Sequence, residues 1–322
     1  YGPAVATDFI NRFREDVQLM KLAGLTHYRT SINWSRFLTD YEAVTVDEEY
    51  AAYYDQLFDE LLANGIEPMI CLEHYELPGY LLEAYGGWGS KKVVELYVRY
   101  VEQVFARYHH KVTRWFTFNE PIVVQTRVYL DALRWPYEQN TGKWMQWNHH
   151  KVLATAKVVQ LFREKGYQGT VGCILNPEVT YPRSSAAHDL RAAEVYDLFY
   201  NRVFLDPLVH GAYPAELFTL LEKHAVAWDY SADELAIIRD NTVDELGINL
   251  YYPHRVKAPS RTWHPGTPFH PAWYYEPFEL PGRKMNNSRG WEIYPQIVYD
   301  MAMRIKKDYR NIPWFVAESG MG

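Results

Sequence analysis

The hydrophobic residues of this chain follow two patterns that alternate along its length. Apolar residues first recur at helical spacing between residues 8 and 22, at Phe9, Ile10, Phe13, Val17, Met20 and Leu22. Gly24 then follows as a helix stop, and residues 26–31 form a short bounded run that is typical of a strand. This part of the chain is therefore predicted to form one helix and one strand.

The same alternation repeats over the rest of the chain. Further helices are predicted over residues 47–63, 91–108, 148–165 and 295–308, with several helical segments between 187 and 240. Further strands are predicted over residues 67–72, 170–175 and 246–251, and two more end at Glu120 and Glu318. Alternation of this kind is typical of right-handed βα units, so we predict an α/β fold with a parallel sheet.

Length and charge limit the function classes. A chain of 322 residues with 48% hydrophobic residues can bury a large core, and we expect a single domain over residues 1–322. Its formal net charge is −7, with acidic and basic residues interspersed, so no nucleic-acid partner is expected. No run of apolar residues is long enough to span a bilayer, so we expect a soluble, cytoplasmic protein without a membrane partner.

The cysteines give no sign of metal or redox chemistry. Cys71 and Cys173 each lie in an apolar, strand-like run and are far apart in sequence. We interpret them as reduced core residues, and no motif asks for a metal or an organic cofactor.

Two carboxylates stand where predicted strands open into loops. Glu120 ends the run that starts at Trp115, and Glu318 ends the run that starts at Trp314. The carboxyl ends of barrel strands converge on one face, so these residues can meet over one substrate. Two such carboxylates can cleave a glycosidic bond, and the aromatic content of 16% suits a carbohydrate site. The alternative is that each glutamate caps the helix after its strand.

Motifs around both glutamates resemble those of one enzyme family. Residues 117–121, Thr-Phe-Asn-Glu-Pro, resemble the acid/base signature of glycoside hydrolase family 1, and residues 317–320 resemble its nucleophile motif. Other blocks resemble the family in family order: residues 29–36, 74–78, 86–88, 247–251 and 290–295. Ser319 replaces the usual Asn after the nucleophile, a change that removes no catalytic atom.

The resemblance implies a retaining β-glycosidase. Glu318 would be the nucleophile and Glu120 the acid/base, with carboxyl groups about 5 to 5.5 Å apart. Arg29 would contact the nucleophile carboxylate, and the alternative, an ion pair that closes the strand layer, does not exclude this role. Tyr251 would donate a hydrogen bond to the nucleophile.

The remaining site residues are also implied by the family blocks. His74 and Asn119 would contact hydroxyl groups of the sugar, and Asn249 would bind substrate or support the site. Trp291 would stack against the leaving group. Taken alone, His74 reads as a core histidine and Trp291 as a packing residue.

The family fold is a (β/α)8 TIM barrel, and the pattern gives six strands rather than eight. In the resembled family, the first strand lies before Tyr1 and the eighth after Gly322. We therefore expect an incomplete barrel that lacks these two strands.

The middle of the chain indicates a substrate class. Residues 175–185, 201–207 and 253–258 look most like bacterial 6-phospho-β-glycosidases, which implies a phosphorylated disaccharide as substrate. The family residues that bind the phosphate lie after the eighth strand. The alternatives are a β-glucosidase or β-galactosidase for unphosphorylated sugars and a non-catalytic sugar-binding homologue.

One long irregular stretch remains, over residues 259–289. We expect it to form a lid at the entrance of the site, against the alternative of a disordered insertion. Its rings are Trp263, Phe269, Trp273, Tyr274, Tyr275 and Phe278.

Overall fold

A sheet of six parallel strands forms the centre of the fold. The computed structural model describes residues 6–261 and 266–320. The strands are β1 (His27–Ser31), β4 (Glu67–Cys71), β5 (Arg114–Asn119), β6 (Thr170–Leu175), β8 (Glu245–Leu250) and β11 (Trp314–Ser319). They are neighbours in this order, and every pairing between them is parallel. The predicted α/β class and all six predicted strands are confirmed, and the sheet corresponds to part of a (β/α)8 barrel.

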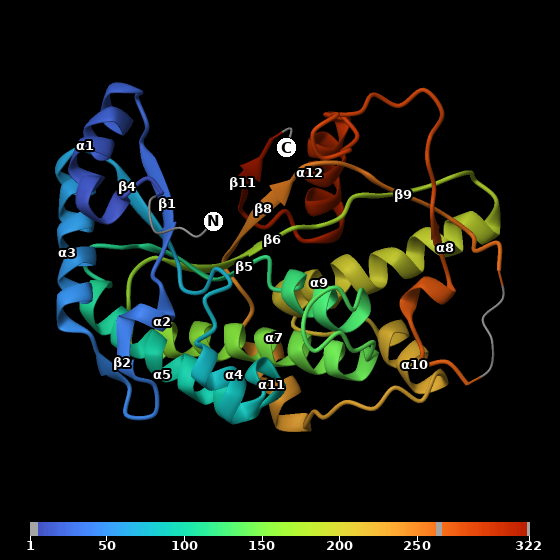
Figure 1. Cartoon of the computed structure of the whole chain (residues 1–322), viewed down its shortest axis with the longest axis horizontal. Helices are drawn as coiled ribbons and strands as arrows, with labels where there is room; N and C mark the ends of the chain where they lie inside the picture. Colours follow the sequence, from blue (N-terminus) through green and yellow to red (C-terminus); the bar gives the residue numbers. More distant parts are fainter. Residues whose placement is uncertain (1–5, 262–265, 321–322) are drawn as a thin grey trace.

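Helices surround the sheet, as Figure 1 shows for α1, α3, α7 and α12. Helix α1 (Phe9–Leu22) precedes β1, and the main helices between successive strands are α3 (Glu48–Ala63), α5 (Lys91–Tyr108), α7 (Thr141–Glu164) and α12 (Gln296–Asp308). The connection between β6 and β8 contains α8 (Ala187–Asp197), η4 (Leu198–Arg202), α9 (Val203–His210), α10 (Ala215–Lys223) and α11 (Ala232–Asp240). The predicted alternation of helix and strand is thus confirmed over the described residues.

Local side chains set where these helices begin. The Asp47 carboxylate accepts a hydrogen bond from the Tyr50 amide at 2.9 Å, which caps α3. Helix α7 begins at Thr141, seven residues before the predicted start at 148, because the Asn140 side chain caps it by accepting from the Lys143 amide at 3.0 Å. Its first turns are buried on several sides, so they lack the one-sided hydrophobic period that the prediction relied on.

Short elements make up the loops, and the sequence pattern did not predict them because each is shorter than two turns of helix or a typical strand. They are α2 (Trp34–Phe37), β2 (Leu38–Asp40), β3 (Thr45–Val46), α4 (Gly79–Tyr85), η2 (Gly87–Gly89), α6 (Val123–Gln125), η3 (Thr126–Leu130), β7 (Thr180–Pro182), β9 (His254–Lys257), η5 (Pro271–Trp273) and β10 (Glu276–Pro277). Strands β10, β9 and β7 form a second, three-stranded sheet beyond the carboxyl ends of the main strands.

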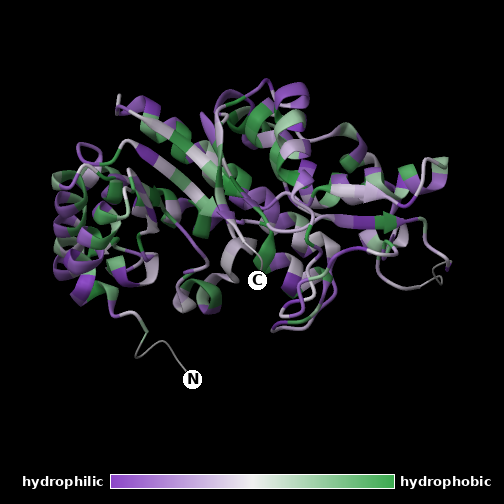
Figure 2. Cartoon of the chain, turned by 90° about the horizontal axis from the view of Figure 1, so that it is seen from above, coloured by the Kyte–Doolittle hydropathy of each residue, from purple (hydrophilic) through white to green (hydrophobic). Residues whose placement is uncertain are grey.

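The core is rich in aromatic rings. Trp34, Trp88, Trp115 and Trp144 are fully or almost fully buried. Figure 2 shows hydrophobic residues gathered on the central strands and on inward helix faces. Cys71 and Cys173 are free and buried, as predicted, and burial raises the pKa of the Cys173 thiol to about 12. That thiol is therefore protonated and unreactive at neutral pH.

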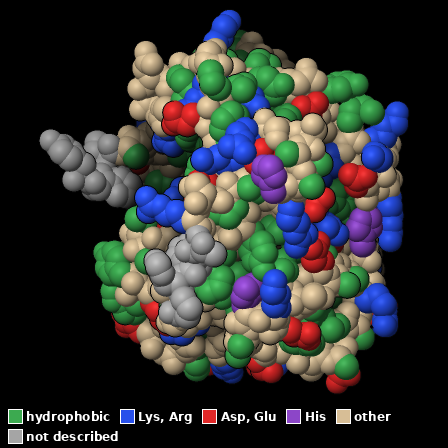
Figure 3. Space-filling model, turned by 90° about the vertical axis from the view of Figure 1, so that its right-hand side faces the viewer, with side chains coloured by type: hydrophobic (Ala, Val, Ile, Leu, Met, Phe, Trp, Pro, Cys, Tyr) green, Lys and Arg blue, Asp and Glu red, His purple; other side chains and the backbone are tan. Residues whose placement is uncertain are grey.

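The surface carries both signs of charge. On the face seen in Figure 3, basic and acidic side chains are interspersed around hydrophobic patches, without a basic stripe. Of the helices within the described residues, none combines the length and the apolar character that a bilayer span requires.

A buried histidine links helix α7 to the segment that returns toward β8. His149 is fully buried, its Nδ1 lies 3.2 Å from the Tyr213 hydroxyl, and its Nε2 lies 3.5 Å from Glu234 at the start of α11. Burial, with a smaller contribution from the neighbouring His150, lowers the pKa of His149 to about 4. The Glu234 carboxylate opposes this shift but does not cancel it.

We predict that His149 makes the protein less stable in acid. Its folded-state pKa lies below its unfolded value of about 6.5, so the unfolded chain takes up the proton first as the pH falls. The free energy of unfolding should fall by up to about 3 kcal/mol between pH 6.5 and pH 4 on account of this residue. Urea unfolding at a series of pH values should show a flatter profile for His149→Gln than for the exposed-site control His188→Gln. Equal slopes of the free energy of unfolding against pH for both variants would contradict the predicted effect of His149.

Candidate active site

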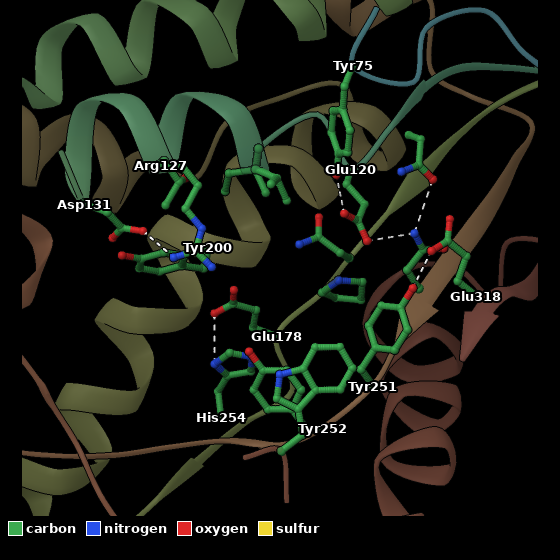
Figure 4. A pocket seen from close by; sticks show the side chains of 18 of the residues that line it. Tyr75, Glu120, Arg127, Asp131, Glu178, Tyr200, Tyr251, Tyr252, His254 and Glu318 are labelled. Carbon is green, nitrogen blue, oxygen red and sulfur yellow. Dashed lines mark hydrogen bonds and ion pairs between the residues drawn. The ribbon is translucent and has the colours of Figure 1, made fainter. Parts of the chain in front are cut away.

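A cavity of about 540 Å³ lies at the carboxyl ends of the strands (Figure 4). Residues at or just beyond the ends of β4, β5, β6, β8 and β11 line it: His74, Tyr75, Asn119, Glu120, Asn176, Asn249 and Glu318. This convergence follows from the parallel order of the strands, which places all their carboxyl ends on one side.

Glu120 stands directly after β5 in a strained backbone conformation. Its φ of 46° lies in the left-handed region, which non-glycine residues rarely adopt. The strain is held by the surroundings, since the Glu120 amide donates to the Ile174 carbonyl at 2.8 Å. Its carboxylate accepts a hydrogen bond from Asn249 Nδ2 at 2.8 Å and another from the Tyr75 hydroxyl. Both of these donors are uncharged.

Glu318 lies near the end of β11 and has a different set of partners. The pairing of β11 with β8 shifts register between Val316 and Glu318, which turns the glutamate into the cavity. Arg29 of β1 forms an ion pair with Glu318 Oε1, and the Tyr251 hydroxyl donates to Oε2. Burial by itself raises the pKa of Glu318, but these two hydrogen bonds and the Arg29 charge outweigh it, so the pKa lies below its usual value.

Asn119 connects the two glutamate environments. Its Oδ1 accepts from Arg29 Nη1 at 3.1 Å and from Asn249 Nδ2 at 3.3 Å. Its Nδ2 lies 3.0 Å from His74 Nε2, within hydrogen-bonding distance. A single hydrogen-bonded network therefore joins side chains from β1, β5, β8 and the loop after β4.

Aromatic rings form one wall of the cavity. Trp291 lines it and stacks on Tyr252, with ring centroids 5.0 Å apart and an interplanar angle of 25°. The Trp291 ring also contacts Tyr251 at 5.1 Å, and the Arg289 guanidinium lies 5.0 Å from its centroid. Such a wall offers an apolar face to a ring-shaped substrate.

The structure thus brings the residues singled out from the sequence to one place. His74, Asn119, Glu120, Asn249, Tyr251, Trp291 and Glu318 line the cavity. Arg29 lies behind it and reaches it through Glu318 and Asn119.

Further residues of the cavity were not predicted from the sequence. Tyr75 lies in the His74 block, but its contact with Glu120 depends on a φ of 73° that no sequence pattern signals. On the outer side, Arg127 pairs with Asp131 at 2.8 Å and His254 with Glu178 at 3.1 Å. Tyr196 and Tyr200 complete this side.

The predicted lid is wrong in its placement. Among the described residues of 259–289, only Arg289 lines the cavity. Phe269 stacks on His224 with an interplanar angle of 3°, and the Tyr275 hydroxyl donates to Tyr200 at 3.0 Å. These rings thus pack on His224, which follows α10, and on Tyr200 of η4, so the stretch supports the cavity wall from behind. Trp263 lies outside the described residues.

The acidic and histidine side chains of the described site do not gather into a metal centre. Within residues 6–261 and 266–320, no cluster of three or more His, Cys, Asp or Glu side chains is suited to hold a metal ion. The cavity instead offers two carboxylates in unlike surroundings and several neutral hydrogen-bond donors.

Comparison with known proteins agrees with this site. The sequence model of glycosyl hydrolase family 1 matches residues 2–322. The 6-phospho-beta-glucosidase GmuD of Bacillus subtilis is 41% identical over 321 residues, which are 100% of this chain and 69% of that protein. Beta-glucosidase A of Acetivibrio thermocellus is 31% identical over 98% of this chain and 68% of that protein.

Solved structures show the same fold. The crystal structure of a beta-glucosidase from Exiguobacterium marinum superimposes with a TM-score of 0.89 at 27% identity, over 100% of this chain and 70% of that chain. A family match over nearly every residue, together with the strand order and the paired glutamates, leads to one conclusion. The chain belongs to glycosyl hydrolase family 1.

Proposed function

We propose that the residues of this cavity make the chain a retaining β-glycosidase in which Glu318 is the nucleophile and Glu120 the acid/base. Glu318 attacks the anomeric carbon while Glu120 protonates the leaving oxygen, and a covalent glycosyl-enzyme forms. Water activated by Glu120 then releases the sugar with retained configuration. In this proposal residues 1–322 belong to one catalytic barrel domain.

The unlike surroundings of the two glutamates carry the assignment of roles. Glu318 is paired with the Arg29 cation and accepts from Tyr251, which favours its ionised form, as a nucleophile requires. The Glu120 partners within the described residues, Asn249 and Tyr75, are both neutral. Unlike Glu318, Glu120 has no cation among these partners, which suits the residue that exchanges a proton with the leaving group. The presence of both carboxylates argues against a non-catalytic sugar-binding protein.

The supporting residues follow from the same network. Asn119 and His74 face the cavity next to Glu120, where they would hold hydroxyl groups of the sugar. Asn249 orients Glu120, and Trp291 offers its face to the leaving group.

The substrate proposed is a 6-phospho-β-glycoside. The chain is 41% identical to a 6-phospho-beta-glucosidase and 31% identical to a beta-glucosidase over similar shares of its length. A phosphorylated sugar is charged and does not cross a bilayer unaided, so this substrate implies a cytoplasmic enzyme. The alternative is a β-glucosidase for unphosphorylated sugars.

The outer cavity favours a sugar as the leaving group. Its side chains include the Arg127–Asp131 and His254–Glu178 pairs as well as aromatic faces. Charged and hydroxyl groups of this kind suit a polyhydroxylated ring, whose hydroxyl groups need hydrogen-bond partners. We therefore propose a phosphorylated disaccharide as the natural substrate.

The two glutamates can be tested with nucleophile rescue. Glu318→Gln and Glu120→Gln should each lower hydrolysis of an aryl β-glycoside by several orders of magnitude, whereas the exposed control Glu164→Gln should not. With an activated leaving group, azide should give a β-azide product in Glu120→Ala and an α-azide product in Glu318→Ala. Full activity in either variant, or the same anomer from both, would refute the roles.

The hydrogen bond from Tyr251 can be tested through the pH profile. Tyr251→Phe removes a donor that lowers the pKa of Glu318, so that pKa should rise. Because the nucleophile must be ionised, the acid limb of kcat/KM should move to higher pH, while it should stay in place in the control Tyr299→Phe. A limb that does not move, or that moves to lower pH, would contradict the role of Glu318.

The substrate can be tested with four aryl glycosides. A phosphate held by charge-assisted hydrogen bonds, each contributing roughly 1.5 to 3 kcal/mol, should raise kcat/KM by orders of magnitude. The measurement compares p-nitrophenyl β-glucoside and β-galactoside with their 6-phosphates. Comparable values with and without phosphate would favour the unphosphorylated β-glucosidase.

A further inference from the structure

Two buried charged residues lie directly behind the cavity. Glu73 comes between β4 and His74 and is 2% exposed, and Lys151 lies in the middle of α7 and is 1% exposed. Burying a charge is costly unless another group compensates it. Neither side chain lines the cavity, so contact with substrate does not explain them.

The two charges favour each other, although their side chains form no direct ion pair in the described part of the chain. Burial raises the pKa of the Glu73 carboxyl above its usual value, and the Lys151 charge is the main opposing effect. Burial likewise lowers the pKa of Lys151, and the Glu73 charge is the main opposing effect. Within the described residues, Glu73 Oε2 accepts no hydrogen bond, so its strongest stabilising interaction is with the ammonium charge.

Lys151 binds the backbone of the segment that carries Glu120. Its Nζ donates to the Pro121 carbonyl at 3.0 Å, one residue beyond Glu120, and shares this acceptor with Gln125 Nε2 at 2.5 Å. The ammonium group lies 5.6 Å from the Phe118 ring centroid and 5.8 Å from that of Trp88. Two aromatic faces therefore hold the cation in place on its other sides.

The backbone of Glu73 binds the same segment on the other side of Glu120. Its carbonyl accepts a hydrogen bond from the Asn119 amide at 2.9 Å. The residues before and after Glu120 are thus each held by one member of the buried pair. Glu120 itself has a φ of 46°, a conformation that persists only where the surroundings enforce it.

We propose that Lys151 and Glu73 are positioning residues for the acid/base step, in which Lys151 fixes the Pro121 carbonyl and Glu73 supplies the buried counter-charge that keeps Lys151 there. This inference rests on the proposed role of Glu120 as the acid. Neither residue touches the substrate; both act through the backbone on either side of Glu120. A shift of that backbone moves the proton donor away from the leaving oxygen, and small misplacements of this kind lower rates strongly.

A leaving-group series separates positioning from a general loss of structure. A 2,4-dinitrophenyl glycoside departs without a proton, whereas a phenyl glycoside needs one from the acid. Lys151→Met should lower kcat/KM by about tenfold to a hundredfold for the phenyl substrate and by less than about threefold for the dinitrophenyl substrate. Lys157→Met, on the same helix, is the matched control and should affect neither. An equal decrease in kcat/KM for the phenyl and the dinitrophenyl substrates would overturn the proposal.

A double variant separates the pair from its structural role. Glu73→Gln and Lys151→Met each leave one buried charge unpaired, and both should lower the unfolding temperature. The combination of the two leaves no buried charge, so it should regain stability but still lack the contact with Pro121. We expect the double variant still to show a lower kcat/KM for the phenyl substrate than the unmodified protein, with little change for the dinitrophenyl substrate. Recovery of both stability and activity would show that the pair is only structural and would overturn the proposal. If a single variant fails to fold, the double variant alone tests the proposal.

Glu120→Gln, measured in parallel, distinguishes the two hypotheses. If Glu120→Gln spares the dinitrophenyl substrate and Lys151→Met does not, the positioning proposal alone is wrong. If Glu120→Gln itself shows no dependence on the leaving group, the acid role of Glu120 fails, and with it the positioning proposal.

Discussion

The contact between Arg29 and Glu318 is the interaction on which the site depends. Arg29 lies on β1 and Glu318 on β11, which are the two ends of the six-stranded order, yet their side chains form an ion pair. The ends of the sheet must approach each other for this contact to exist, so the curvature of a barrel is a condition of the site. A flat sheet with the same strand order would place Arg29 and Glu318 on opposite margins. The ion pair therefore couples the global curvature of the fold to the ionisation of one carboxylate.

Two carboxylates can do different work in one cavity only if their surroundings differ. Glu318 receives a cation and a phenolic hydroxyl, while Glu120 receives an amide and a phenolic hydroxyl. Asn119 lies between them and accepts from both Arg29 and Asn249, so neither set of donors can move independently. The difference in surroundings is thus fixed by the scaffold before any substrate arrives, which is how an active site avoids reorganisation during the reaction.

Much of the fold and part of the candidate site could be predicted from the sequence, because they depend on residues close together along the chain. Strand runs and helix stops are properties of neighbouring residues, so the six strands followed from them. The family blocks supplied seven of the residues that line the cavity, and the others were not predicted. The early start of α7 was missed because its first turns are buried on several sides. The contact of Tyr75 with Glu120 was missed because it depends on backbone conformation, and the lid was misplaced because the partners of Phe269 and Tyr275 come from distant helices. The electrostatic interaction between Glu73 and Lys151 could not be predicted either, because only the packing of α7 brings these two residues close together.

Strain and burial at this site are connected. A left-handed glutamate between Asn119 and Pro121 has a cost, and nearby groups must hold it against relaxation. Behind the strand end, the buried side chains of Gln125 and Lys151 both donate to the Pro121 carbonyl, so they hold this segment without occupying the cavity. The burial of the Lys151 charge must in turn be compensated, which favours a charge of opposite sign nearby. Glu73 supplies that charge, and the ring faces of Phe118 and Trp88 confine the cation without offering it an alternative hydrogen-bond acceptor. Under the proposed mechanism, the free energy lost in burying the two charges is the physical cost of holding Glu120 rigidly while its front remains open to the cavity.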